Sequence, residues 1–439
     1  MNTLQKKNRN VVQDAADIHH SLLAAINAKN NCFITGSAGT GKSYIVNEIT
    51  KNSRARITLT ASTGIAAMNI GGVTVHSWSG INTNNHPHLL DKVVSSKNFH
   101  WTMKRIAKTQ LLIIDEIGML TAGQMDLLDE VCRYAIHNAT GDYRTAPVFG
   151  GIQVILTGDF LQLPPVAKGA TSKGYTWAFE SKVWKRMNMR TFNLTKIHRQ
   201  DNVEFCNILN NVRFGVVDPS DMEVLRSRVG KVLPPPLVPT RFVSTNRAVA
   251  TGNQEELDKA SGTLHTFNAE SSVVDHFKAW ESIILPQVAE FSKMEAKLQV
   301  KVGMPVMMLV NRALDDETYN NGSMGVFLGV TSDGSPRVKL HSSGKEVIVS
   351  KYTDELKSGD GTPKASMTQY PFRLAHYMTY HKSQGLTLEA VEVDMANVFA
   401  PGMMYVGLSR VKTLEGLTIK NFNPMAIKAD PKALRFYKT

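Results

Sequence analysis

One stretch near the start of the chain constrains its fold more than any other feature. Residues 36–43 read Gly-Ser-Ala-Gly-Thr-Gly-Lys-Ser and match GxxxxGK[ST], the pattern of a phosphate-binding loop. A short apolar run, residues 31–35, precedes the motif, and a helical pattern follows it. A glycine-rich turn between a buried strand and a helix is typical of an α/β domain with a parallel sheet.

The residue types in this loop suit a nucleotide polyphosphate. Glycines let backbone N–H groups approach phosphate oxygens, and the N-terminus of the following helix adds a favourable dipole. Lys42 would bring positive charge to the phosphates, and the Ser43 hydroxyl would ligate Mg²⁺. The alternative is a glycine-rich turn before an ordinary helix. We assign the nucleotide to Gly36, Ser37, Ala38, Gly39, Thr40, Gly41, Lys42 and Ser43.

Further apolar runs, separated by helical patterns, extend this domain. They lie at residues 57–60, 111–115 and 152–159, and a helical pattern covers 123–137. The runs are nearly continuous rather than alternating, as expected for strands buried on both faces of a parallel sheet. This alternation of strand and helix predicts a doubly wound α/β domain.

An acidic pair follows one of these strands. Asp115 stands at its carboxyl end and would hold Mg²⁺, and Glu116 would polarise the attacking water as a general base. By itself, an apolar run followed by Asp-Glu usually marks only the end of a strand. Together with the phosphate loop, the pair predicts a site that hydrolyses a nucleotide.

The second half of the chain changes character twice. Prolines at 234–236 and 239 break regular structure and predict a connection. Residues 300–352 contain glycine turns and short strand-like pieces (PVMMLVN, GVFLGV, RVKL, EVIVSK), which predict a small β module. Helix–strand patterns then resume, so the chain reads as two α/β domains, the second interrupted by a β insert.

Charge and composition narrow the class of protein. Lys plus Arg number 50 and Asp plus Glu 38, giving a net charge of +12, which favours a polyanionic partner such as nucleic acid. Three widely spaced cysteines, Cys32, Cys132 and Cys206, argue against a disulfide framework or a cysteine-rich zinc site. We find no secretory signal and no apolar run of about 18 residues, and so expect no membrane span.

Two arginines call for comparison, Arg199 in LTKIHRQ and Arg410 in YVGLSR. Either could be an ordinary surface arginine. An arginine presented to the terminal phosphate across a domain cleft would stabilise transition-state charge and raise the rate by roughly 10³–10⁵. Spacing alone does not decide between these roles.

Taken together, the motifs resemble the superfamily 1 helicases, and most closely the Pif (petite integration frequency) family, related to RecD and Dda. In order they are GSAGTGKS (36–43), TASTGIAA (60–67), GGVTVHSWSGI (71–81), LLIIDEIGML (111–120), GGIQVILTGDFLQLPPV (150–166), LTKIHRQ (194–200), HKSQGLTLE (381–389) and YVGLSR (405–410). The resemblance runs from about residue 12 to the end.

The resemblance implies a fold: an α/β protein with two RecA-like P-loop motor domains, each a parallel sheet flanked by helices. It also implies a small wedge insert and a small Src-homology-3-like β-barrel insert. We place the first motor domain at residues 1–190 with the wedge at about 82–105, the second at 191–299 and 373–439, and the barrel at 300–372.

The same resemblance implies the roles of further site residues. Gln162 is similar to the sensor of the γ-phosphate, Arg199 and Arg410 to two arginine fingers, and Gly385 to a position close to the nucleotide. The implied cofactors are ATP and Mg²⁺. A glutamine upstream of the phosphate loop usually recognises adenine; Gln13 is the candidate, although it lies 23 positions before Gly36.

A DNA path is implied as well. We expect contacts to the strand from Ser62, Thr63, Gly64, Thr74, His76, Ser77, Trp78, His381, Lys382 and Ser383. Hydroxyls and backbone amides bind phosphates without reading sequence. Trp78 could stack a base or be a core residue, and His76 and His381 could be structural histidines.

The expected function is therefore an ATP-dependent DNA helicase moving 5′-to-3′ on single strands, in replication, recombination or repair. Expected partners are single-stranded DNA, forked or tailed duplex, and a single-strand-binding protein or replisome component, with no membrane. The compact chain suits a bacterial or phage enzyme in the cytoplasm. Alternatives are a translocase that displaces proteins with little unwinding, a passive single-strand-binding module, and a nuclease.

Overall fold

The computed structural model of the chain divides into two compact units. It describes residues 11–12, 15–81, 90–96, 99–138, 141–165, 175–200, 202–235, 237–292, 294–314, 317–319, 321–341, 343–357 and 362–438. Unit 1 comprises residues 1–217, 399–405 and 427–439, and unit 2 comprises residues 218–398 and 406–426.

Unit 1 is built on a seven-stranded parallel sheet with the strand order β1-β7-β2-β6-β5-β3-β4. The predicted strands at 31–35, 57–60, 111–115 and 152–159 are confirmed within one or two residues. The strands are β1 (Val11–Val12), β2 (Cys32–Gly36), β3 (Ile57–Ala61), β4 (Val73–Thr74), β5 (Leu111–Asp115), β6 (Gln153–Gly158) and β7 (Arg190–Leu194).

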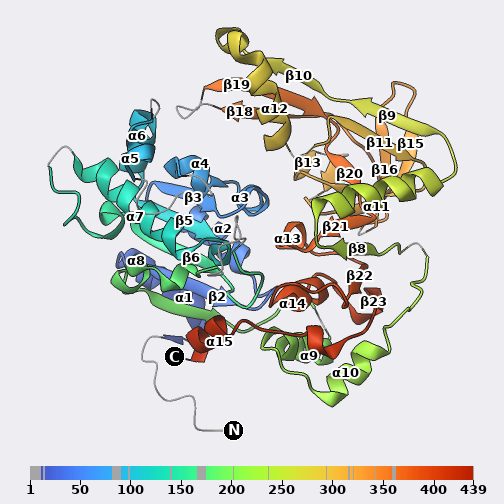
Figure 1. The fold of residues 1–439 in the computed structure, drawn as a ribbon, viewed down its shortest axis with the longest axis horizontal. Helices are drawn as coiled ribbons and strands as arrows, with labels where there is room; N and C mark the ends of the chain where they lie inside the picture. The colour runs from blue at the N-terminus through green and yellow to red at the C-terminus, as the bar shows by residue number, and fades with distance from the viewer. Residues whose placement is uncertain are drawn as a thin grey trace. The chain divides into compact units, whose positions relative to one another are not determined.

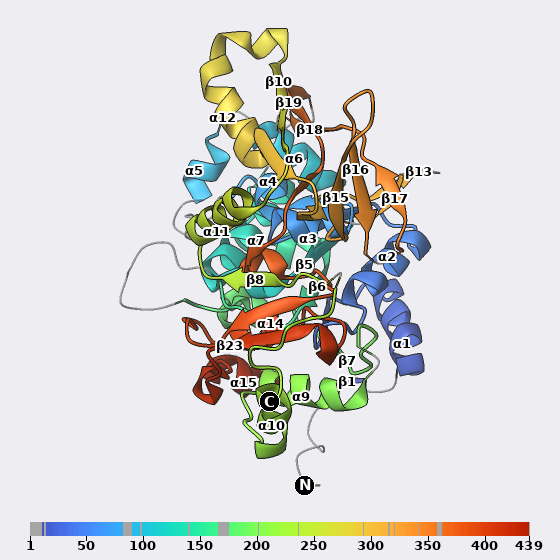
Figure 2. The ribbon, with the colours of Figure 1, turned by 90° about the vertical axis from the view of Figure 1, so that its right-hand side faces the viewer.

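Helices cover both faces of this sheet (Figures 1 and 2). Alternate residues of β5 show why: Leu112 and Ile114 belong to one apolar cluster, and Leu111 and Ile113 to the other. The unit's helices are α1 (Ala15–Asn27), α2 (Lys42–Asn52), α3 (Gly64–Asn69), α4 (Val75–Ser79), α5 (Leu90–Val94), α6 (Phe99–Lys108), η2 (Ile117–Met119), α7 (Ala122–His137), η4 (Val148–Gly151), η5 (Ala178–Glu180), α8 (Lys182–Arg186), α9 (Val203–Arg213) and α15 (Pro431–Lys438).

The predicted boundary between the motor domains is wrong at residue 190. Strand β7 pairs along its length with β2, so it belongs to the first sheet, and α9 follows it within unit 1. The chain's last helix, α15, also belongs to unit 1, where Phe436 packs on Phe33 and Phe160. Residues 373–439 therefore do not all lie in the second domain, because aromatic packing returns the end of the chain to the first.

Unit 2 contains a second, smaller parallel sheet with the order β21-β8-β22-β23. Its strands are β8 (Thr240–Val243), β21 (Tyr377–Thr379), β22 (Val391–Asp394) and β23 (Leu417–Lys420). The helices of this part are α10 (Pro219–Arg226), α11 (Asn246–Lys259), α13 (Tyr380–Ser383), η7 (Leu414–Gly416) and η8 (Pro424–Ala426), while α14 (Met403–Leu408) runs across the boundary between the units.

The rest of unit 2 is rich in antiparallel strands, as the strand-like pieces predicted. A five-stranded sheet has the order β17-β16-β15-β12-β20, and β10, β18 and β19 form a separate sheet. The elements of this part of unit 2 are β9 (Leu264–Asn268), β10 (Glu270–Val273), η6 (Asp275–Trp280), α12 (Glu281–Phe291), β11 (Lys297–Lys301), β12 (Pro305–Met308), β13 (Arg312–Leu314), β14 (Glu317–Tyr319), β15 (Met324–Val330), β16 (Pro336–Leu340), β17 (Glu346–Ile348), β18 (Tyr352–Lys357), β19 (Pro363–Gln369) and β20 (Phe372–Leu374).

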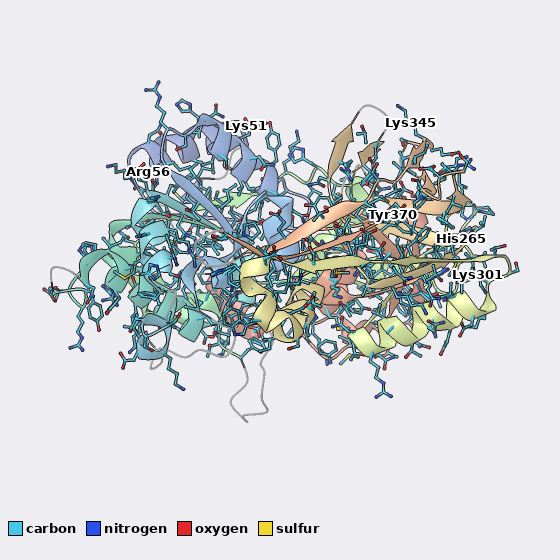
Figure 3. All side chains as sticks on the ribbon, turned by 90° about the horizontal axis from the view of Figure 1, so that it is seen from above. Lys51, Arg56, His265, Lys301, Lys345 and Tyr370 are labelled. Atoms are coloured by element: carbon cyan, nitrogen blue, oxygen red, sulfur yellow. The ribbon has the colours of Figure 1, made fainter. Side chains whose placement is uncertain are left out.

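These strands extend beyond the predicted limits of 300 and 372. Strand β11 pairs with β9, where His265 and Lys301 lie, and Lys345 lies in the turn between β16 and β17 (Figure 3). The Src-homology-3-like barrel stays a prediction. Of the predicted wedge, residues 82–89 and 97–98 lie outside the described residues, as does Gln13; the rest includes α5 and most of α6. No described helix is both long and apolar enough to cross a membrane.

Candidate nucleotide and DNA site

The predicted chemistry gathers at one edge of the unit 1 sheet. Because the strands are parallel, their carboxyl ends share an edge, and ligands of such sheets bind there. The phosphate loop follows β2, Asp115 ends β5, and the turn that carries Gln162 follows β6. Residues that are far apart in sequence are therefore brought together by the sheet.

The phosphate loop has the backbone that its glycines predict. Gly39 and Gly41 adopt φ of 80° and 84°, a region that side chains disfavour. The Lys42 amine donates to the carbonyls of Gly36 and Ser37, at 2.8 and 2.9 Å. Burial lowers the pKa of Lys42, and the nearby carboxylates of Asp159 and Glu116 oppose this. The ammonium thus lies within the loop, where phosphate charge would be compensated.

Asp115 and Glu116 lie at the end of β5, as predicted. Asp115 is 4% exposed, and its Oδ1 accepts hydrogen bonds from the Thr157 hydroxyl and from the Glu116 backbone N–H. Burial raises the pKa of Asp115 despite these bonds. Glu116 has a φ of 53°. A carboxylate buried at a sheet edge with neutral partners suits a cation ligand.

Gln162 lies in the turn after β6, and its side chain is 4% exposed. The Gln162 N–H donates to the Asp159 carbonyl at 3.3 Å. The side-chain Oε1 is buried and has no hydrogen-bond partner among the described residues. A buried amide oxygen without a donor is costly, so this position fits a residue that completes its bonding with a water or a ligand.

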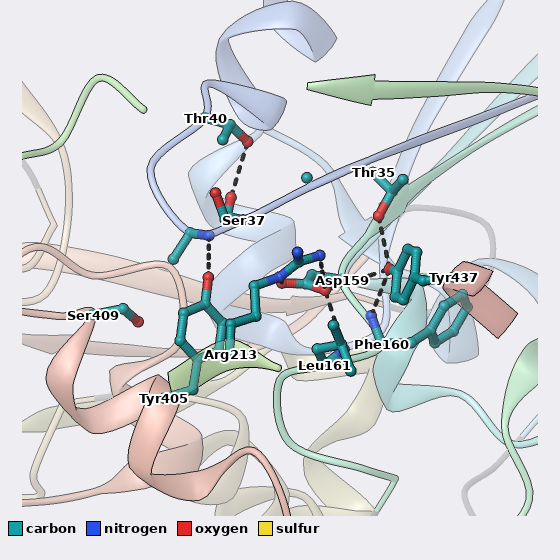
Figure 4. Close-up of polar contacts among 12 residues, drawn as sticks. Thr35, Ser37, Thr40, Asp159, Phe160, Leu161, Arg213, Tyr405, Ser409 and Tyr437 are labelled. Atoms are coloured by element: carbon teal, nitrogen blue, oxygen red, sulfur yellow. Dashed lines mark hydrogen bonds and ion pairs between the residues drawn. The ribbon is translucent and has the colours of Figure 1, made fainter. Parts of the chain in front are cut away.

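Arg213, at the end of α9, is a further residue of this edge that was not predicted from the sequence. Its Nε and Nη2 both donate to the Asp159 carboxylate at 2.9 Å, and the two residues are 6% and 2% exposed (Figure 4). Burial would raise the pKa of Asp159, but the charge and hydrogen bonds of Arg213 hold it below its ordinary value. One hint is present in the sequence: Asp159 directly follows a predicted buried strand, and a buried carboxylate requires a partner.

Arg199 lies beside the phosphate loop. The His198 N–H donates to the Gly39 carbonyl at 2.8 Å, and a Cβ added to Gly39 would lie 2.6 Å from the Cβ of Arg199. The segment after β7 therefore rests directly on the loop. Arg199 and the phosphate loop both belong to unit 1, and the finger role of Arg199 stays a prediction.

Arg410 has a different environment. Its guanidinium is 1% exposed and donates to the Val406 carbonyl, the Ser409 hydroxyl and, at 3.4 Å, the carbonyls of Ser383 and Leu386. In this arrangement it braces the turn that contains Gly385, which has a φ of 79°. A finger role for Arg410 would require a change of side-chain conformation and stays a prediction.

The DNA-facing loops predicted in unit 1 follow neighbouring strands, β3 and β4. Thr63 and Thr74 cap helices α3 and α4 by accepting from the backbone N–H groups of Ala66 and Ser77. Gly64 and Ser77 are exposed, and burial lowers the pKa of His76. These loops place polar groups at the carboxyl edge of the sheet, as the predicted path requires.

Three members of the predicted DNA path are not free to contact a strand through their side chains. Trp78 is 3% exposed in the apolar core with Val75 and Ile106, so stacking on a base is wrong and the core alternative holds. The Ser383 hydroxyl is fully buried and donates to the Tyr380 carbonyl, and the predicted contact of Ser383 with DNA stays a prediction. Ser62 donates its hydroxyl to the Glu116 carbonyl at 2.6 Å, which ties this loop to the acidic pair.

In unit 2, His381 and Lys382 lie on α13, directly after β21. Both side chains are half-buried, and burial lowers the pKa of each. Their position at the carboxyl end of a parallel strand matches that of the unit 1 loops. Contact with DNA stays a prediction for both.

Comparison with known proteins supports a single family. The family model for PIF1-like helicases matches residues 4–223. The chain is 36% identical over 430 residues to the human ATP-dependent DNA helicase PIF1, covering 95% of this chain and 63% of that protein. It thus spans less than two thirds of this curated relative.

Two solved structures cover nearly the whole chain. The crystal structure of Pif1 helicase from Candida albicans has a TM-score of 0.77 and 31% identity, covering 97% of this chain and 99% of that one. The structure of Bacteroides Pif1 bound to single-stranded DNA has a TM-score of 0.67 and 28% identity, covering 97% of each chain.

Proposed function

Because the chain belongs to the PIF1-like helicase family, we propose that it is an ATP-dependent DNA helicase. It translocates 5′-to-3′ on single-stranded DNA and unwinds duplex during replication, recombination or repair. The observation that carries this proposal is the constellation at one sheet edge of unit 1: the phosphate loop with Lys42 follows β2, Asp115 ends β5, and Gln162 lies in the turn after the intervening strand β6.

Each residue of this site has its own role in the proposed hydrolysis of ATP. Ser43 and Asp115 would hold Mg²⁺, which when bound neutralises charge on the phosphates. Lys42 compensates the charge of the phosphates within the loop. Glu116 accepts the proton of the attacking water. Gln162, whose Oε1 is buried without a partner in the described part of the chain, orients that water or senses the terminal phosphate.

Single-stranded DNA and forked or tailed duplex are the proposed nucleic-acid partners. The exposed Gly64 and Ser77, together with Thr63, His381 and Lys382, supply backbone N–H, hydroxyl and cationic groups for phosphates. The net charge of +12 favours this contact. We also propose a single-strand-binding protein or replisome component as a protein partner, and the cytoplasm as the compartment.

The test of this function is ATP hydrolysis with and without single-stranded DNA. Strong stimulation is expected, and absence of any stimulation would overturn the proposal. DNA affinity should fall with salt, with a log–log slope of about −0.7 for each phosphate contact. A flat response to salt would remove the proposed path.

The arginines are tested in the same assay. Arg199→Ala should reduce DNA-stimulated turnover by about 10³-fold while nucleotide affinity changes little, because a finger acts mainly in the transition state. Lys196→Ala is the matched control, since Lys196 is an exposed cation of the same segment. Arg410→Ala should give a comparable loss only if its guanidinium leaves the carbonyls that it now contacts. Near-normal turnover in either arginine variant removes that residue from the site.

A further inference from the structure

A tyrosine near the end of the chain contacts two parts of the nucleotide site at once. Tyr437 lies on α15, 278 residues after Asp159 in the sequence. Its hydroxyl is nevertheless buried between β2 and the turn after β6 that carries both Asp159 and Gln162, here called the Gln162 turn (Figure 4). Its oxygen is 2.8 Å from the Thr35 hydroxyl, 3.1 Å from the Phe160 N–H and 3.3 Å from Asp159 Oδ1. Thr35 directly precedes the phosphate loop.

The hydrogen-bond inventory of a phenol accounts for all three contacts. The Tyr437 oxygen accepts from the Phe160 N–H and the Thr35 hydroxyl, and its own O–H donates to the Asp159 carboxylate. No capacity is left over. The hydroxyl therefore links the strand that enters the phosphate loop to the turn that carries Gln162.

Further contacts restrict the movement of the Gln162 turn. Arg213 holds the carboxylate with two hydrogen bonds, and the Leu161 N–H donates to it at 3.1 Å. From the other side, Gly402 approaches so closely that an added Cβ would lie 2.3 Å from the Gln162 carbonyl oxygen. These contacts hold the backbone of the turn that carries Gln162. The Tyr437 hydroxyl, on α15, joins this network to β2 through its hydrogen bond with Thr35.

We propose that Tyr437 is a positioning residue for nucleotide hydrolysis: its hydroxyl fixes the Gln162 turn against the phosphate loop. This inference rests on the proposed function, because it assigns a role within that site. Tyr437 itself touches no substrate. Its effect belongs to the transition state, because a small misplacement of a group that orients the reacting water lowers kcat more than it weakens binding.

The test removes only the hydroxyl. Tyr437→Phe keeps the ring, which packs on Phe160 and Phe436. We expect kcat for DNA-stimulated hydrolysis to fall about tenfold, with KM for ATP changed less than about twofold. Binding of ADP with aluminium fluoride, a mimic of the transition state, should weaken by about the same factor, while ADP alone binds normally.

Tyr175→Phe is the matched control. The Tyr175 hydroxyl donates to Asp430, which caps the start of the same helix, but it touches neither β2 nor the Gln162 turn. This variant should lower thermal stability without changing kcat. Equal loss of kcat in both variants would mean that α15 acts only as a structural anchor and would overturn the proposal.

A second variant makes the test independent of one residue. Thr35→Val removes the partner hydroxyl while keeping a β-branched side chain in the strand. If the bond is the cause, Thr35→Val and Tyr437→Phe should each lower kcat, and the double variant should be little worse than either single one. Additive losses would contradict the linkage.

The inference and the function fail separately. If wild-type protein shows no DNA-stimulated hydrolysis, the proposed function is wrong, and the ratio of affinities for ADP–aluminium fluoride and ADP still reads the position of the turn. An unchanged ratio in Tyr437→Phe overturns the inference, whatever the activity.

Discussion

Two buried carboxylates on neighbouring strands have opposite environments. Asp115 ends β5 and Asp159 follows β6, and the two side chains are 4% and 2% exposed. Asp159 is paired with Arg213, which holds its pKa below the ordinary value although burial alone would raise it. Asp115 accepts only neutral donors in the hydrogen bonds described, and burial raises its pKa.

The contrast separates a structural carboxylate from a functional one. A buried charge is tolerated when it is paired, and an unpaired one favours binding of a cation. No cationic side chain forms an ion pair with Asp115 in the described part of the chain, although the charge of Lys42 acts on it from nearby. Asp159 already has its cation. We therefore propose that Asp115 serves a metal ion and that Asp159 holds the turn that carries Gln162.

The largest expected effect comes from neutralising the unpaired acid. Asp115→Asn should reduce ATP turnover by about 10³-fold, because it removes charge that acts on the reacting phosphates. The free energy of unfolding should change by no more than about 1 kcal/mol, since the amide relieves a buried charge. Turnover assays and thermal unfolding check this. Turnover within tenfold of wild type would erase the distinction between the two acids.

Breaking the paired acid should instead cost stability. Arg213→Met leaves Asp159 buried without its cation and should lower the free energy of unfolding by about 3–5 kcal/mol at neutral pH. In the wild type the pair stabilises the fold above the ordinary carboxyl pKa of 3.8, and this is lost as pH falls through the lower folded pKa.

In the variant the sign reverses. Burial without Arg213 raises the pKa of Asp159, so the deficit relative to wild type should shrink as pH falls toward about 4. Denaturant unfolding at several pH values measures this. A deficit that stays constant with pH would show that Arg213 contributes packing rather than charge.

Removing both charges sharpens the comparison further. Asp159→Asn combined with Arg213→Met should recover roughly 1.5–3 kcal/mol of the loss, because no unpaired charge remains buried. The Asn oxygen can still accept from the Leu161 N–H. A double-mutant cycle in denaturant measures the coupling, and simple additivity would argue against a direct ion pair.

The smallest effect is expected at the neutral partner of Asp115. Thr157→Val removes one hydroxyl donor from a fully buried site without a large change of shape. The free energy of unfolding should fall by about 1 kcal/mol, and turnover by about two- to tenfold as Asp115 loses orientation. A loss as large as that of Asp115→Asn would place Thr157 in the chemistry itself.

The sequence predicted the local parts of this site well. The phosphate loop, β5 and Asp115 are specified by short runs whose composition and glycines dictate their backbone, and the structure has them where the sequence placed them. The pairings made at long range were not predictable. Arg213 and Tyr437 meet Asp159 across 54 and 278 residues, and no local pattern marks either one as its partner.

Trp78 shows a different limit. The resemblance implied a contact of its motif with DNA, yet its own helix, α4, turns the indole into the core beside Val75 and Ile106. Exposure of one residue within a five-residue helix depends on how neighbouring helices pack. The domain boundary failed for a similar reason, because aromatic packing of α15 returns the end of the chain to unit 1.

Strand separation tests the central claim, a motor driven by ATP, most directly. Duplexes with either a 5′ or a 3′ single-stranded tail are incubated with the protein and ATP, and with Asp115→Asn as the inactive control. We predict separation only from the 5′ tail, and only with ATP and the unchanged protein. Hydrolysis without separation would favour a translocase that displaces proteins. Separation from the 3′ tail alone, or equal separation by the Asp115→Asn variant, would contradict the account.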